Sequence, residues 1–113
     1  GHAALGGIDA LALIAAHPAR IAHVHCKDVR REVFDTLRAS GASFLDGVLD
    51  GIFTVPGDGS LDYAALMAAL AKIRYSGWIV IEAEQDPALA DPRTYAQLGL
   101  GTLRERAAAA GLQ

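Results

Sequence analysis

Ionisable side chains gather at the ends of two short segments whose residues alternate as in a β-strand. One segment ends in His25 and Lys27, and the other ends in Glu82 and Glu84. An imidazole and a carboxylate are suitable ligands for a divalent metal such as Mn²⁺, Co²⁺, Mg²⁺ or Zn²⁺. The pattern is compatible with a metal site, but His-x-His and Glu-x-Glu are also common as ordinary polar strand ends.

Two predicted strands, residues 20–27 and 78–84, must position these groups. Side chains of a strand point alternately to its two faces, so each strand has one apolar face and one face that becomes ionisable toward its end. The apolar faces consist of Ala22, Val24, Cys26, Ile79, Ile81 and Ala83. The opposite faces begin with Ile21, His23, Trp78 and Val80. We expect helices to cover the apolar faces, which makes Cys26 a buried structural thiol, and we expect Trp78 to be a core residue.

Two segments on either side of the first strand have helical patterns, residues 8–16 and 62–74. The earlier helix should end before Pro18, because a residue that precedes proline avoids the α-helical region. The later helix has two candidate N-terminal caps, Ser60 and Asp62.

A third predicted helix, residues 92–110, should end at Gly111, since glycine readily adopts the left-handed conformation that terminates helices. Its apolar stripe is expected to consist of Leu100, Leu103, Ala107 and Ala110. Helices and strands therefore alternate along the chain, which indicates an α/β fold with parallel strands. In a barrel of such strands, catalytic groups lie at the carboxyl ends, where the four ionisable residues stand.

Residues 29–59 form a connection of roughly thirty residues, far longer than the few residues usual between such elements. We interpret this segment as an insertion that forms a rim or lid at one end of the sheet. It contains short helical patterns around residues 33–37 and at residues 44–49, and a turn-rich loop at residues 55–59. A third strand at residues 52–55 is the competing interpretation.

The composition describes one globular domain and argues against several classes of protein. The 113 residues are 52% hydrophobic and 20% charged, which is enough for a core and unlike a disordered chain. A net charge of −3 without a basic run gives no sign of nucleic-acid binding. No apolar run is long enough to cross a membrane. The single cysteine, Cys26, indicates a reducing compartment, so we expect a cytoplasmic protein with no nucleic-acid or membrane partner.

Four sequence blocks occur in an order that resembles a known family. They are Gly1–Ala4, His23–Asp28, Phe53–Gly59 and Gly77–Pro87. Together they look like the C-terminal part of the inosose dehydratases, a branch of the xylose-isomerase-like TIM barrels that is related to sugar epimerases and hydroxypyruvate isomerases. The third block and the end of the fourth are specific to the dehydratase branch. The resemblance implies that residues 1–113 are a single partial domain, a C-terminal fragment of a (β/α)8 barrel.

The resemblance also implies a metal site. Members of the superfamily hold one divalent ion with two glutamates, one aspartate and one histidine from four strand ends. His25 matches the ligand histidine, and Glu82 matches the last ligand glutamate. The family's aspartate would stand two residues before Gly1 and the other glutamate earlier still, so this chain would carry half of the site. Mn²⁺ or Co²⁺ is the expected ion, with Mg²⁺ or Zn²⁺ as alternatives.

Other residues match positions that contact substrate in the relatives. His2 would match a histidine that approaches substrate oxygens, although a Gly-His start can also be a cloning remnant. Arg30 or Arg31 follows the histidine strand where the relatives place a substrate-contacting arginine, and either can equally be a solvated surface residue. Asp58 lies in a turn that its flanking glycines explain better than a substrate role.

The implied reaction is the removal of water from 2-keto-myo-inositol in inositol catabolism, so the expected partner is a small cyclic polyol ketone. A base must remove the proton beside the ketone, a Lewis acid must hold the enolate oxygen, and an acid must protonate the departing hydroxyl. The metal would be the Lewis acid, Glu82 is the candidate base, and His2 or Lys27 is the candidate acid. A sugar epimerase or isomerase of the same superfamily is one alternative. An inactive fragment that acts only as an assembly module is another.

The length of the chain limits what it can do alone. A TIM barrel needs about 250 residues for eight units, so 113 residues make fewer than four units. One face of the strands would then remain uncovered, and open strand edges invite pairing with another chain. We therefore expect the isolated chain to be inactive, to bind metal weakly, and to form homo-oligomers or need its missing N-terminal part.

Overall fold

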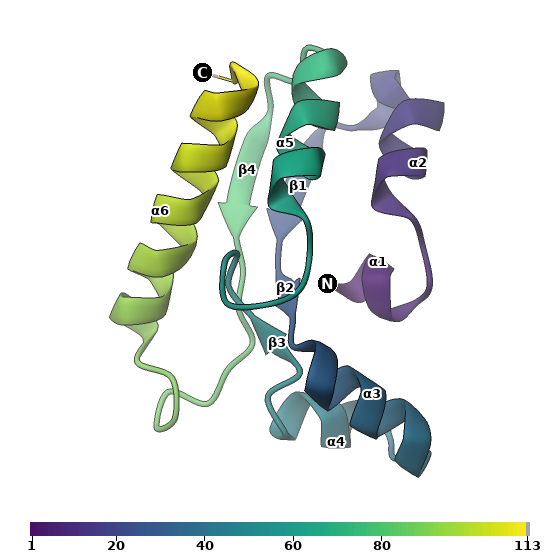
Figure 1. Ribbon diagram of the computed structural model, residues 1–113, viewed down its shortest axis with the longest axis vertical. Helices are drawn as coiled ribbons and strands as arrows, with labels where there is room; N and C mark the ends of the chain where they lie inside the picture. Colours follow the sequence, from purple (N-terminus) through teal and green to yellow (C-terminus); the bar gives the residue numbers. More distant parts are fainter. Residues whose placement is uncertain (113) are drawn as a thin grey trace.

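The computed structural model describes residues 1–112 of the chain, and Figure 1 shows its arrangement. At its centre is a two-stranded parallel sheet of β1 (His23–Cys26) and β4 (Trp78–Ile81). The register pairs the first residues of the two strands with each other, and likewise the last. The ladder continues for one more hydrogen bond, in which the Glu82 amide donates to the Cys26 carbonyl at 3.1 Å. The predicted α/β arrangement with parallel strands is thereby confirmed.

Three helices pack against one face of this sheet (Figure 1). They are α2 (Ala10–Ala16), α5 (Tyr63–Lys72) and α6 (Pro92–Ala110). α5 lies between the other two and contacts both. The core consists of Ile14, Cys26, Tyr63, Met67, Leu70 and Leu103, with Val24, Ile79 and Ile81 packed against it from the sheet. Cys26 is a buried thiol, as predicted, and burial raises its pKa to about 11.

The helix ends follow the capping residues of the sequence. α2 and α5 begin after Asp9 and Asp62, whose carboxylates accept hydrogen bonds from backbone amides of the first turn. α6 begins after Asp91, which caps it in the same way, and ends at Gly111, where φ is 78°. The predicted bounds of α6 are therefore confirmed, and Asp62 rather than Ser60 is the cap of α5.

A short helix and a 3₁₀ turn lie on either side of α2. α1 (His2–Leu5) precedes it, and a 3₁₀ turn (Pro18–Arg20) leads from it into β1. α2 ends at Ala16, two residues before the proline, as the sequence predicts. None of the helices within residues 1–112 is both long and apolar enough to cross a membrane.

The long connection forms a small unit at the carboxyl end of β1 (Figure 1). It contains α3 (Arg31–Ser40), α4 (Phe44–Leu49) and an antiparallel pair of two-residue strands, β2 (Asp28–Val29) and β3 (Phe53–Thr54). The competing prediction of a strand at residues 52–55 is therefore correct in its position. A second, smaller core consists of Val29, Ile52 and Phe53. The role of this insertion as a rim or lid stays a prediction.

Several predictions about the strand residues are wrong. Trp78 lies on the predicted face, opposite the helices, but it is 77% exposed and is not a core residue. Ile21 packs against the helix-side core, because it belongs to the end of the 3₁₀ turn, where strand alternation does not apply. Ala22 and Ala83 are exposed, because they lie outside the residues that form the sheet.

The stripe predicted along α6 is confirmed at Leu103, Ala107 and Ala110, which face the core, and is wrong at Leu100. Leu100 is 41% exposed, whereas Gly99 and Leu103, four residues apart on one face, are buried. A Cβ atom at Gly99 would lie 3.1 Å from side-chain atoms of Ile81 and Val55. The glycine therefore lets α6 approach the sheet closely.

Candidate functional site

The parallel register places the ionisable strand ends side by side. The offset between β1 and β4 puts Lys27 opposite Glu82. His25 lies two residues before Lys27 and Glu84 two residues after Glu82, so all four side chains leave the sheet on the same face. The residues that the sequence pattern singled out thus meet at the carboxyl end of the sheet.

His25 and Glu82 form the exposed part of this group. His25 Nδ1 lies 2.8 Å from Glu82 Oε2, and the two side chains are 54% and 37% exposed. The imidazole also packs against the ring of His23, with 5.1 Å between the ring centres. Hydrogen bonds from Lys27 and His25 lower the pKa of Glu82 to about 2. The pair is therefore open to solvent, and its carboxylate is ionised at neutral pH.

The ammonium group of Lys27 lies beside this pair and is closed off from solvent. Its side chain is 4% exposed, and Nζ lies 2.8 Å from Glu82 Oε1 and 2.9 Å from Glu84 Oε2. The ring of Phe53 covers it from another side, with 4.6 Å between Nζ and the ring centre. Burial by itself lowers the pKa of Lys27, but the hydrogen bonds to the two glutamates outweigh burial, so the pKa is raised. Lys27 is thus a charged group whose donors are committed within the protein.

His2 packs on the same aromatic ring. Its ring centre lies 4.7 Å from that of Phe53 and 5.9 Å from that of Phe44. The histidine is exposed, so its imidazole can meet a molecule from solvent. Gly1 permits this approach, because a Cβ atom there would lie 2.8 Å from the carbonyl oxygen of Lys27. His2 and Lys27 therefore both contact the ring of Phe53.

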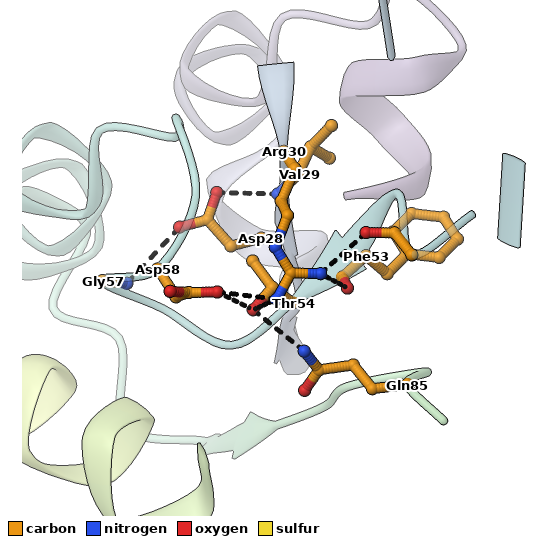
Figure 2. Close-up of polar contacts among 9 residues, drawn as sticks. Asp28, Val29, Arg30, Phe53, Thr54, Gly57, Asp58 and Gln85 are labelled. Atoms are coloured by element: carbon orange, nitrogen blue, oxygen red, sulfur yellow. Dashed lines mark hydrogen bonds and ion pairs between the residues drawn. The ribbon is translucent and has the colours of Figure 1, made fainter. Parts of the chain in front are cut away.

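Arg30 is held within the insertion by four hydrogen bonds. Its Nη1 donates to the carbonyls of Gly51 at 2.7 Å and Phe53 at 3.2 Å. Its Nη2 donates to Thr54 Oγ1 at 3.1 Å and to Asp58 Oδ2 at 2.8 Å, as Figure 2 shows. The donors of this guanidinium are therefore largely used by the protein itself.

Arg31 is in a different situation. It is the first residue of α3, is exposed, and places its guanidinium over the ring of Phe34 at 5.7 Å. The geometry thus distinguishes the two arginines between which the sequence could not decide. Arg31 is the arginine that is exposed to solvent. Its aromatic contact is with Phe34, which belongs to the insertion and not to the His25–Glu82 pair.

Thr54 is the centre of the cluster around Arg30, and the sequence pattern did not reveal it. Its buried hydroxyl donates to Asp58 Oδ2 at 2.6 Å and accepts from Gln85 Nε2 at 3.2 Å (Figure 2). Gln85 directly follows Glu84, so the cluster joins the insertion to the segment after β4. Asp58 has a structural role in its turn, in line with the interpretation of its flanking glycines.

Asp28 is a second residue to which the sequence interpretation gave no role. It is 1% exposed, and its Oδ1 accepts hydrogen bonds from the amides of Val29 at 2.7 Å and Leu61 at 2.9 Å. Its Oδ2 accepts a longer one from the Gly57 amide at 3.4 Å (Figure 2). A Cβ atom at Gly59 would overlap the Asp28 carboxylate. The two glycines are the signal that could have revealed this contact, because they indicate a close approach of the backbone.

The His25–Glu82 pair fits two positions around a divalent ion. Nitrogen and oxygen ligands lie about 2.0–2.2 Å from such an ion, so two ligands at right angles are about 3 Å apart. The 2.8 Å between His25 Nδ1 and Glu82 Oε2 is close to that separation. Within residues 1–112, no group of three or more histidine, cysteine, aspartate or glutamate side chains could hold an ion. The described residues therefore supply two ligand atoms that suit a metal, and not a complete site.

Similarities to known proteins cover nearly the whole chain. The family model for xylose isomerase-like TIM barrels matches residues 1–106. The rhizopine catabolism protein MocC of Rhizobium meliloti is 53% identical over 113 residues, which are 100% of this chain and 35% of that protein.

Proteins named inosose dehydratase show similar identities. The inosose dehydratase of Geobacillus kaustophilus is 48% identical over 98 residues, which are 87% of this chain and 32% of that protein. That of Salmonella typhimurium is 50% identical over 99 residues, or 88% of this chain and 33% of that protein. The chain thus spans about a third of the length of the curated relatives it matches. The family model matches residues 1–106, and β1 and β4 are parallel, as in such a barrel. The chain therefore belongs to the xylose isomerase-like TIM barrel family.

Proposed function

We propose that the chain is the C-terminal part of a metal-dependent inosose dehydratase, a hydro-lyase that removes water from 2-keto-myo-inositol. The observation that carries the proposal is the approach of His25 Nδ1 to Glu82 Oε2 at the carboxyl ends of two parallel strands. Proteins named inosose dehydratase, which are about half identical to this chain, support it. Because the single cysteine is a free, buried thiol, we place the protein in a reducing compartment, the cytoplasm.

In this proposal, His25 Nδ1 and Glu82 Oε2 hold the ion. The ion proposed is Mn²⁺ or Co²⁺, as the family resemblance implies, and Mg²⁺ and Zn²⁺ are alternatives that imidazole and carboxylate can also bind. The other ligands come from parts of the barrel outside the matched third. When bound, the ion supplies Lewis-acid stabilisation of the oxygen that becomes negative at the substrate ketone. A carboxylate must be ionised to bind a metal ion, and the pKa of Glu82, about 2, keeps its carboxylate ionised at neutral pH.

Two proton transfers are left to side chains. A base removes the proton from the carbon beside the ketone, and the hydroxyl on the next carbon leaves as water after it receives a proton. Glu82 is the candidate base, since its carboxylate is ionised and 37% exposed. A carboxylate with such a low pKa is a weak base. The step therefore relies on the acidity that the ketone confers on the neighbouring C–H bond.

His2 is better placed than Lys27 to protonate the departing hydroxyl. Its ring is exposed and held by aromatic contacts, whereas Lys27 is buried and donates to two glutamates. Arg31 is the better candidate for a contact with substrate hydroxyls, because Arg30 uses its donors to hold the insertion together.

Turnover of 2-keto-myo-inositol by the complete barrel tests the proposal. Protein treated with a chelator should be inactive, and Mn²⁺ or Co²⁺ should restore formation of the dehydrated dione. His25→Gln should lower kcat/KM by about 100-fold or more. Mutation of residues that only hydrogen-bond to a metal ligand already lowers metal affinity or activity by about 10–100-fold, and His25 is proposed as a ligand itself. His17→Gln is the matched control, because His17 is an exposed residue at the end of α2 and should leave activity unchanged.

A comparison of substrates separates this proposal from the alternative reaction of the same barrel. An epimerase or isomerase would share the metal and the proton abstraction but return the proton to carbon. If the protein interconverts ketohexose epimers faster than it dehydrates the inosose, the dehydratase proposal is wrong.

A further inference from the structure

The ammonium group of Lys27 occupies a place where a metal ion could otherwise bind. Two carboxylate oxygens, Glu82 Oε1 and Glu84 Oε2, lie within 2.9 Å of Nζ. Carboxylate oxygens are good ligands for divalent ions, which take them at about 2.0–2.6 Å. Small side-chain movements would therefore let the same two oxygens hold a metal ion in place of the ammonium.

The other oxygen of Glu82 contacts His25 instead of Lys27. Oε2 lies 2.8 Å from His25 Nδ1 and belongs to the exposed part of the group. Glu82 thus stands between two cation positions, one already filled by Lys27 and one beside His25. Which position an incoming ion takes depends on whether the ammonium can be displaced.

Several contacts keep the ammonium in place. The Lys27 side chain is 4% exposed, its two carboxylate partners accept at 2.8 and 2.9 Å, and the Phe53 ring lies 4.6 Å from Nζ. Among residues 1–112, Lys27 is also the only ion-pair partner of Glu84. A buried ammonium that loses such partners is left uncompensated, which is costly.

From these contacts we infer that Lys27 is a positioning residue: it fills the position between Glu82 and Glu84 as a built-in cation and directs the metal ion to Glu82 Oε2 and His25 Nδ1. The inference rests on the proposed metal site of the complete barrel. It assigns no proton transfer to Lys27, and it gives Glu84 the role of counter-charge to Lys27 instead of metal ligand.

Binding of Co²⁺ to the complete barrel, measured by titration calorimetry, tests the inference through its dependence on His25. In the wild-type background, His25→Gln should weaken Co²⁺ binding by about 10-fold or more, as expected for a lost ligand. In the Lys27→Met background, His25→Gln should weaken Co²⁺ binding by less than about 3-fold, because the position between Glu82 and Glu84, which Lys27 no longer fills, now accepts the ion. Adding Glu84→Gln to that double variant should bring back the loss of about 10-fold or more that His25→Gln causes in the wild-type background.

The outcomes separate this inference from the proposed function. If His25→Gln weakens Co²⁺ equally in both backgrounds, the inference about Lys27 is wrong while the metal site stands. If His25→Gln has no effect on the wild type, both the metal site and the inference fail. Circular dichroism spectra of all variants check that they are folded.

A measurement on the unaltered protein covers the case in which Lys27→Met does not fold. Anomalous scattering from crystals of the wild-type barrel soaked with Co²⁺ locates the ion directly. The ion should lie within ligand distance of His25 Nδ1 and Glu82 Oε2, with the Lys27 ammonium still between the glutamates. An ion ligated by Glu84 would overturn the inference.

Discussion

Glu82 is the residue on which the chemistry of the site depends most directly. Lys27 donates to its Oε1 at 2.8 Å, and His25 Nδ1 lies 2.8 Å from its Oε2, so both oxygens of one carboxylate have a polar partner. Charge-assisted hydrogen bonds of this kind are stronger than neutral ones and favour the ionised carboxylate. Glu82 is thereby held as an anion in a fixed orientation before any ion or substrate arrives.

The acid dependence of stability should report this environment. The pKa of Glu82 is lowered from 4.5 to about 2 in the folded protein, so its contribution is complete above pH 4.5 and is lost as the pH falls toward about 2. The effect is screened, because the side chain is 37% exposed. Denaturant unfolding at a series of pH values should therefore show a smaller loss of stability over this range in Glu82→Gln than in the wild type.

An exposed glutamate provides the control for this measurement. Glu105 lies on α6 with a side chain that is 68% exposed, so Glu105→Gln should keep the wild-type dependence on pH. The prediction is contradicted if both variants and the wild type lose stability equally over this range.

At the scale of elements, buried polar groups join the insertion to the sheet. The Thr54 hydroxyl on β3 connects Arg30 and Asp58 with Gln85 of the segment after β4. The Asp28 carboxylate on β2 holds the loop that leads to α5. These contacts compensate for the short pairing of β2 with β3, which comprises two residues on each strand.

Removal of the Thr54 hydroxyl should weaken this connection. Thr54→Val keeps the shape of the side chain but leaves its buried partners without their hydrogen bonds, which costs about 1–3 kcal/mol of unfolding free energy. Thr36→Val, on the exposed part of α3, should change it by no more than about 0.5 kcal/mol. Urea denaturation measures both, and equal effects of the two substitutions would refute a structural role for the Thr54 hydroxyl.

Two glycines should respond to alanine with opposite signs. Gly57 has φ +96°, and a Cβ atom there would overlap Thr102 of α6, so Gly57→Ala should destabilise the protein by about 1–3 kcal/mol. Gly101 lies inside α6 with open space around it, so Gly101→Ala should stabilise by about 0.5–1 kcal/mol through helix propensity. Thermal unfolding of both variants checks the signs. Two shifts in the same direction would contradict the positions described for these glycines.

At the scale of the whole molecule, the sheet is covered on one side only. The helices α2, α5 and α6 lie on one face (Figure 1), while Trp78 on the other face is 77% exposed. Parallel sheets are normally buried on both faces, and the matched relatives are about three times as long as this chain. The uncovered face is the inner face that the rest of a closed barrel would fill.

We therefore expect the isolated chain to be inactive and to bind Mn²⁺ or Co²⁺ weakly, since its described residues supply two ligand atoms. Its open face and strand edges should lead it to self-associate unless the rest of the barrel is supplied. Sedimentation velocity combined with a metal titration measures both properties. A stable monomer with a tight, stoichiometric metal site would contradict this expectation.

Local chemistry in the sequence was sufficient to predict most of the helices and the phase of the strands. Asp91 and Gly111 mark the ends of α6 because capping acts within one turn of the helix. Alternation in the two strands predicts that His25 and Glu82 share a face, and their side chains do meet at 2.8 Å. Their metal-binding role remains a prediction.

Tertiary structure decided what depends on contacts between distant segments. The register of β1 against β4 puts Lys27 opposite Glu82, and packing of the insertion places Phe53 over its ammonium. The pairing of β2 with β3 was not predicted, because strands of two residues have almost no periodicity to detect. Arg30 and Arg31 are equivalent as a sequence pair and differ only in which carbonyls and carboxylates surround them. Burial and hydrogen-bond partners belong to the folded arrangement, so no local pattern could have distinguished them.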